Sequence, residues 1–162
     1  MPKKYIFYAA LAAALLFPLS AVHAKELPGL TWSDRTSKET ADGDIKETPP
    51  HVEIGGIRLS RFSQMQALAL EDTLTIRGDE TPETLYVFQA WQGGASQGEQ
   101  LMLLSVSSSG VDIIGPYPAD FESLKIKPAS ADTGPVFDLC GPDSQVPSTS
   151  LEYFDGQLLK LN

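Results

Sequence analysis

The sequence is short of the residues on which much protein chemistry depends. Its 162 residues include one cysteine and two histidines. A single cysteine excludes an internal disulfide, and it excludes any zinc or iron–sulfur site built from several thiolates. Basic residues are also few, with 12 Lys and Arg against 21 Asp and Glu and a formal net charge of −9. Because phosphate binding needs clustered positive charge, we expect no nucleic-acid partner.

The first 24 residues have the composition of a secretory signal peptide. Two lysines precede an apolar run over residues 5–19, and small or aliphatic side chains occupy the positions three and one before Lys25. The run is too short for a spanning helix and contains Pro18. We therefore predict a cleaved signal peptide over residues 1–24 and no stable membrane insertion after cleavage. The predicted location is the periplasm, with secretion as the alternative.

Cleavage would leave a more acidic chain with little catalytic equipment. Residues 1–24 hold two of the basic residues and none of the acidic ones, so the remaining chain has a formal charge of −11. It keeps His51 as its one histidine and Cys140 as its one cysteine. In an oxidising compartment Cys140 must be buried, react or pair with another chain. Its place after the apolar run at residues 136–139 favours burial.

Residues 25–50 have the composition of a flexible polar arm. From residue 31 onward Trp32 and Ile45 are the only large apolar residues, and a Pro-Pro pair ends the segment. Such a segment buries too little surface to offset the entropy of ordering it. The alternative is that Leu27, Leu30 and Trp32 dock on the domain.

Residues 51–162 are predicted to form a single β domain, because short apolar runs alternate with turn residues and hardly any helical period occurs. Hairpins are expected at Gly-Gly 55–56 and at Asp-Gly 155–156. Residues 84–91 and 100–106 are apolar on both faces, which indicates central strands covered on each side. We expect an all-β antiparallel meander of about eight to ten short strands, closed as a small barrel or sandwich.

No pattern in the chain predicts catalysis. His51 and Cys140 are the only pair that resembles a base and a nucleophile, and nothing in their spacing suggests the necessary geometry. The Ser-Ser-Ser-Gly run at residues 107–110 lacks the nucleophile elbow and suits a turn. We therefore expect no catalytic residue and no cofactor.

Two groups of acidic residues are candidate cation ligands. The Asp-Gly-Asp at residues 42–44 departs from the EF-hand spacing after its second acid. The second group surrounds a predicted turn and consists of Asp72, Asp79, Glu80 and Glu83. Solvated loop acids explain both groups, so no metal site is predicted.

The best candidate for binding is the long loop at residues 91–98. It combines Trp91 with the polar side chains of Gln92, Ser96 and Gln97, and its small residues allow a partner's backbone to approach. Loops on rigid β scaffolds often carry binding. The alternative is a hairpin tip whose Trp91 caps the core.

A second candidate is the stretch at residues 114–121. Two prolines hold it extended, so that Tyr117 and the neighbouring Asp120 would be presented to a partner at low entropic cost. The alternative is a connection that crosses between sheets.

Composition and charge favour a protein-binding function over catalysis. Our leading hypothesis is an inhibitor or immunity-type protein that neutralises an envelope-targeting enzyme, such as a lysozyme or a delivered toxin. The net charge of the chain would attract a basic enzyme. One alternative is a structural or accessory envelope module that binds a partner at a sheet edge. A second alternative is a hydrolase that uses paired acids.

Overall fold

The computed structural model describes residues 29–77, 82–94, 97–130, 133–141, 143, 145 and 147–161. The predicted signal peptide lies outside these residues, as do Ser96, Asp79 and Glu80. Nearly all regular structure in the described part is β, which confirms the all-β prediction. No helix in those residues is long and apolar enough to cross a membrane.

The described chain forms thirteen strands and one short 3-10 helix; ten of the strands, β4 to β13, lie within residues 51–162, in line with the eight to ten predicted there, and the other three lie before residue 50. The elements in order are β1 (Leu30–Ser33), β2 (Thr36–Glu39), β3 (Ile45–Thr48), β4 (His51–Ile54), β5 (Ile57–Arg58), η1 (Phe62–Gln64), β6 (Ala67–Arg77), β7 (Pro82–Trp91), β8 (Gln100–Ser107), β9 (Val111–Pro118), β10 (Lys125–Lys127), β11 (Val136–Asp138), β12 (Ser150–Phe154) and β13 (Gln157–Lys160). They make four antiparallel sheets, β1-β4-β5, β2-β3, β6-β7-β8-β9 and β10-β11-β12-β13.

The β6-β7-β8-β9 sheet is the centre of the fold because β7 and β8 are apolar on both faces. Side chains alternate between the faces of a strand, so an uninterrupted apolar run requires cover on each side. Six consecutive residues of β8 are buried, Leu101 to Val106. The prediction that residues 84–91 and 100–106 form covered central strands is therefore confirmed.

Each face of the central sheet carries its own core. One core joins the sheet to β4 and η1, and its buried members are Val52, Ile54, Phe62, Met65, Leu68, Phe88, Ala90, Met102, Leu104 and Val106. The other joins it to β11 and β12, and its buried members are Leu85, Val87, Leu101, Leu103, Ala119, Phe137, Leu139, Leu151 and Tyr153.

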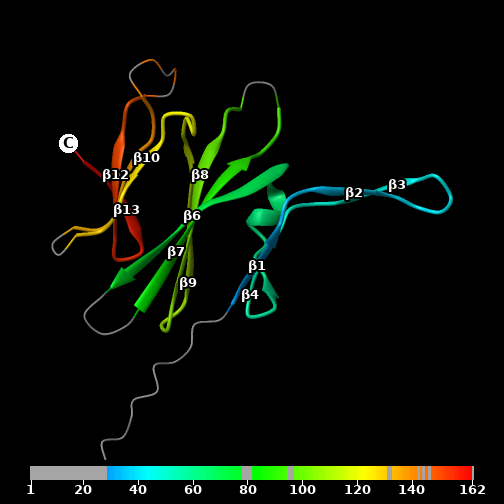
Figure 1. Ribbon diagram of the computed structural model, residues 1–162, viewed down its shortest axis with the longest axis horizontal. Helices are drawn as coiled ribbons and strands as arrows, with labels where there is room; N and C mark the ends of the chain where they lie inside the picture. The colour runs from blue at the N-terminus through cyan, green and yellow to red at the C-terminus, as the bar shows by residue number, and fades with distance from the viewer. Residues whose placement is uncertain are drawn as a thin grey trace, which may run out of the picture.

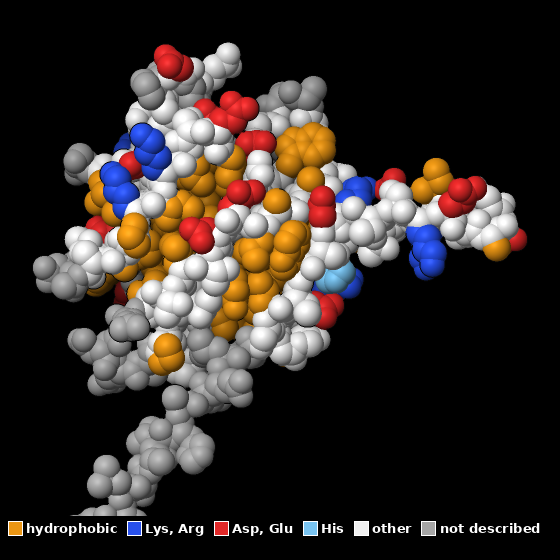
Figure 2. Space-filling view, viewed as in Figure 1, with side chains coloured by type: hydrophobic (Ala, Val, Ile, Leu, Met, Phe, Trp, Pro, Cys, Tyr) orange, Lys and Arg blue, Asp and Glu red, His pale blue; other side chains and the backbone are white. Residues whose placement is uncertain are grey.

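The molecule is therefore layered, with the β1-β4-β5 sheet on one side of the central sheet and the β10-β11-β12-β13 sheet on the other (Figure 1). Figure 2 shows hydrophobic side chains reaching the surface in two bands, one on each side of the central sheet. Both four-stranded sheets run as consecutive hairpins, as a meander does. Closure as a barrel or a two-sheet sandwich is not confirmed.

Residues 30–48, which belong to the expected flexible arm, contain three strands. β1 pairs with β4, with Leu30 opposite Ile54, and the Trp32 ring meets the Phe88 ring edge-on at a centroid distance of 6.1 Å. β2 and β3 form a hairpin that projects from the layers (Figure 1). Composition misses β1 because its pairing with β4 and the contact of Trp32 with Phe88 are long-range. It misses β2 and β3 because these exposed strands lack an apolar pattern.

Both hairpins predicted from dipeptides are present. β4 and β5 flank Gly55 and Gly56, which have φ values of 57° and 79°. β12 and β13 flank Asp155 and Gly156, with φ values of 48° and 73°. Positive φ at both central residues matches the twist of the flanking strands, which explains why these dipeptides signal hairpins.

Candidate functional site

Trp91, the last residue of β7, is held firmly without being buried. Its indole Nε1–H donates to the carbonyl of Gln97 at 2.9 Å, and its own carbonyl accepts from the backbone N–H of Gln66 at 2.7 Å. The side chain nevertheless keeps 38% of its surface exposed. The loop after β7 therefore presents a large aromatic surface in a fixed orientation.

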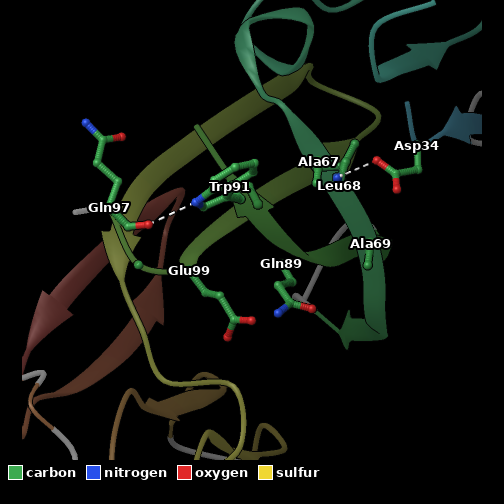
Figure 3. Close-up of a pocket in the computed structure, with 10 residues that line it drawn as sticks. Asp34, Ala67, Leu68, Ala69, Gln89, Trp91, Gln97 and Glu99 are labelled. Atoms are coloured by element: carbon green, nitrogen blue, oxygen red, sulfur yellow. Dashed lines mark hydrogen bonds between the residues drawn. The ribbon is translucent and has the colours of Figure 1, made fainter. Parts of the chain in front are cut away.

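A pocket of about 440 Å³ lies beside this tryptophan (Figure 3). Ala67 of β6 is opposite Trp91, and Ala69 is opposite Gln89. Directly opposed residues point to the same face of a sheet, so these four side chains share one surface. The two alanines leave the space that larger side chains would fill, and Trp91 rises beside it.

Two carboxylates line the same pocket. Asp34, which follows β1, accepts the backbone N–H of Leu68 through Oδ1 at 2.8 Å. Glu99 precedes β8 and is exposed. Glu99 lies two residues before Leu101, the residue opposite Gln89, which brings Glu99 near that amide. No Lys, Arg or His lines the pocket among the described residues.

Arg35, the neighbour of Asp34 in sequence, bonds to Gln66 and Glu47 rather than lining the pocket. Its Nε–H donates to the carbonyl of Gln66 at 3.0 Å, and Nη1 bonds to Glu47 Oε2 at 2.6 Å. A third bond joins Nη2 to the Gln66 side-chain oxygen. These contacts fasten the base of the β2-β3 hairpin to the start of β6 beside the pocket.

Only some of the predicted binding residues line the pocket beside Trp91. Trp91 and Gln97 line the pocket, whereas Gln92 is half-buried in the same loop outside the lining and Ser96 is not described. Tyr117 lies on β9 opposite Leu101, where it packs against the second core.

Asp120 holds a turn. Its Oδ1 accepts the N–H of Glu122 at 3.1 Å, its Oδ2 accepts the hydroxyl of Ser123, and its own N–H donates to the carbonyl of Leu139 at 2.8 Å. Asp120 does not line the pocket beside Trp91.

Sequence reasoning missed the remaining lining residues. The Ala-Leu-Ala-Leu run at residues 67–70 suits either a helical turn or a strand, and its alternation of small and large residues is the available signal for an open surface. Gln89, a polar residue inside an apolar strand, was a second signal. The sequence contains no signal that Asp34 and Glu99 belong to the site, because only pairing between strands far apart in sequence brings them to one pocket.

The residues weighed for catalysis are separated or enclosed. His51 Nδ1 lies 3.0 Å from Ser33 Oγ on one side of the central sheet. Cys140, 8% exposed and beside the second core, bonds through Sγ to the carbonyl of Pro147 at 2.9 Å. The expected burial of Cys140 is confirmed, and His51 is not its partner. The described residues contain no group of three or more His, Cys, Asp or Glu placed to hold a metal ion.

A polar network lies between the central sheet and β12. The hydroxyls of Ser105 and Tyr153 both donate to Oε1 of Glu83. Ser105 and Tyr153 are 3% and 2% exposed. Burial, and then the hydrogen bond to Glu83, raise the pKa of Tyr153 well above its usual value. Because its two donors are buried and satisfied, this network stabilises the packing of the central sheet against β12.

Comparisons of the chain with protein-family models, with curated proteins and with solved structures find no match.

Proposed function

We propose that this chain is an exported binding protein of the inhibitor or immunity type, which neutralises a basic envelope-targeting enzyme such as a lysozyme or a delivered toxin in the periplasm. The observation that carries the proposal is the pocket beside Trp91, an anchored aromatic side chain on an open face of an acidic protein. The export signal predicted over residues 1–24 supplies the location.

The fixed and partly exposed ring of Trp91 supports a role as an anchoring residue in a protein–protein contact. Tryptophan is enriched among residues whose truncation costs a complex most of its affinity. A side chain that is already fixed loses little conformational entropy on binding. The hydrogen bond from Nε1–H to Gln97 fixes the ring, and 38% exposure leaves surface to bury.

Charge supports a basic partner. Without residues 1–24 the chain carries a formal charge of −11, and the pocket contributes Asp34 and Glu99 without a lining cation among the described residues. Such a field accelerates encounter with a basic protein, and the acceleration declines as salt screens it.

The accessory-module alternative has one observation in its favour. β13 is an edge strand, and exposed apolar side chains gather around it, namely Phe154 at 60%, Leu159 at 45% and Leu161 at 40%. Unpaired edges with apolar side chains are suited to strand addition. β9, an edge of the central sheet, is less available because Arg61 donates to the carbonyls of Ile113 and Gly115.

The proposal is tested by capture from envelope extract with immobilised residues 25–162, at low and high salt. We expect recovery of one basic enzyme whose wall-degrading activity the soluble chain inhibits, with loss of recovery at high salt and in Trp91→Ala. Phe154→Ala is the matched control, an exposed aromatic residue on another sheet, and should retain the enzyme. Recovery of an acidic or membrane-bound assembly, indifferent to salt and lost in Phe154→Ala, would overturn the proposal in favour of the accessory module.

A further inference from the structure

The surface of the pocket beside Trp91 favours an occupant with an apolar part. At about 440 Å³ it lies toward the small end of ligand pockets. Its surface between β6 and Trp91 is formed by Ala67 and Ala69, which provide an apolar strip next to the aromatic ring. An aliphatic side-chain stem can therefore lie along this strip with the indole ring beside it.

The carboxylates that line the pocket favour an occupant that carries hydrogen-bond donors. Asp34 uses Oδ1 for the backbone of Leu68, and the described residues give Oδ2 no hydrogen bond. Glu99 has neither a hydrogen bond nor an ion pair from its side chain within the described chain. Figure 3 shows these two carboxylates on different sides of the alanine strip, with the Gln89 amide beside Glu99.

Nothing within the described pocket neutralises these acceptors. Arg35 is already bonded to Gln66 and Glu47, so it is not free to turn inward without losing those contacts. A pocket with an apolar strip, an aromatic wall and two carboxylates suits a planar cation on an aliphatic stem. Guanidinium groups stack on aromatic faces and donate several hydrogen bonds in one plane.

We propose that the pocket beside Trp91 receives an arginine side chain presented by the partner. The stem lies along Ala67 and Ala69, the guanidinium stacks against Trp91 and donates to Glu99, and Asp34 adds negative charge from the other side of the alanine strip. The inference rests on the proposed function for the existence of a basic partner, and it adds the chemistry of the central contact.

The test is an NMR titration of residues 25–162 with the peptide acetyl-Gly-Arg-Gly-amide to about 20 mM, well above a millimolar dissociation constant. The indole N–H signal of Trp91 is the readout, and that of Trp32 is the internal reference, assigned through Trp32→Phe. We expect the Trp91 signal to move and saturate while the Trp32 signal stays. The same peptide with neutral citrulline in place of arginine should bind about tenfold more weakly, because it lacks the charge.

Substitutions of the two pocket carboxylates test whether the arginine peptide binds in this pocket. Glu99→Gln and Asp34→Asn should each weaken arginine-peptide binding about two- to fivefold, the range of an exposed ion pair. Asn at position 34 keeps an acceptor for the Leu68 N–H, so the fold is retained. Glu39→Gln on the exposed β2 makes the same charge change away from the pocket and should leave binding unchanged.

Three results would overturn the inference: a Trp91 signal that does not move, equal binding of the citrulline peptide, or equal weakening by Glu39→Gln and Glu99→Gln. Capture of a basic enzyme that depends on Trp91, together with an unmoved Trp91 signal, would overturn this inference alone. Arginine-peptide binding without capture of any basic enzyme would overturn the proposed function alone.

Discussion

Tyr153 is a buried residue with an ionisable side chain. It is 2% exposed, and its hydroxyl donates to Glu83, which also accepts from Ser105. Burial and the adjacent carboxylate raise its pKa well above the usual value. In the unfolded chain a tyrosine ionises near pH 10. The protonated hydroxyl therefore contributes stability that is fully present below about pH 10 and is lost as pH rises further.

Tyr153→Phe should lower the free energy of unfolding by about 1–3 kcal/mol at neutral pH, because Glu83 loses a buried donor. Above about pH 10 the gap between wild type and variant should narrow, because unfolding lets the wild-type tyrosine ionise. Urea unfolding of both proteins from pH 7 to 11 measures the gap. A constant gap over that range would contradict the assignment of the alkaline loss to Tyr153.

Asp138 gives the opposite pH dependence. Hydrogen bonds from Lys127 and then from Ser150 lower its pKa below the ordinary value, and the Lys127 Nζ–Asp138 Oδ2 distance is 2.9 Å. A lowered pKa contributes stability above the unfolded value, and that stability is lost as pH falls through the folded value. The Lys127 side chain is 63% exposed, so solvent screening limits the contribution of the pair to under about 1 kcal/mol.

We expect Asp138→Asn to be less stable than wild type above about pH 5, with the difference shrinking as the pH falls below about 4 toward the lowered pKa of Asp138. Thermal unfolding across that range measures the difference. Asp44→Asn, at the tip of the exposed β2-β3 hairpin, is the charge-matched control and should follow wild type. A loss in Asp138→Asn that persists unchanged at pH 3 would show that packing, and not charge, is its cause.

At the scale of elements, the approach of the segment before β11 to β12 depends on the absence of a side chain at Gly134. A Cβ built on Gly134 would lie 1.8 Å from the backbone carbonyl oxygen of Tyr153. The Gly134 N–H also donates to Glu152 Oε1 at 3.0 Å. Any larger residue must push this segment away from β12.

Gly134→Ala should therefore destabilise the protein by more than about 2 kcal/mol, as overpacking against backbone does. Gly110→Ala is the control, because no atom lies within 4 Å of the added Cβ, and should change stability by under about 0.5 kcal/mol. Denaturant unfolding of both variants decides the point. Equal effects would mean that the segment before β11 shifts freely.

The sequence could predict the elements that are set by local patterns and not those that depend on tertiary pairing. Residues 84–91 and 100–106 were predictable because a two-faced apolar run is a local pattern, and the hairpins at residues 55–56 and 155–156 because turn dipeptides are local signals. β1 was not predictable, because its partner β4 and the ring contact of Trp32 with Phe88 are set by tertiary pairing.

The candidate site likewise contains residues that the sequence could predict and residues that it could not. Trp91 and Gln97 were predictable from a long loop that combines an aromatic residue with polar ones. Ala67 was not, since its place opposite Trp91 is a matter of register between β6 and β7. Tyr117 and Asp120 were expected to present themselves to a partner, and the structure places them against the second core and in a turn.

At the scale of the whole molecule, the central sheet has a core on each face and a pocket at the end of β7. The two flanking sheets hold this sheet rigid by burying both faces, and the Trp91 loop extends from it. Under the proposed function, this fixed aromatic surface would bind at low entropic cost, and the acidic charge of the chain would direct a basic partner toward it.

The most direct test of this account is calorimetric titration of the captured basic enzyme with residues 25–162, comparing wild type, Trp91→Ala and Phe154→Ala. The account predicts that Trp91→Ala raises the dissociation constant by about 30-fold or more, as expected for a central anchoring residue. Phe154→Ala should bind as wild type does. A dissociation constant that is unchanged in Trp91→Ala and raised in Phe154→Ala would contradict the account and assign binding to the β13 edge.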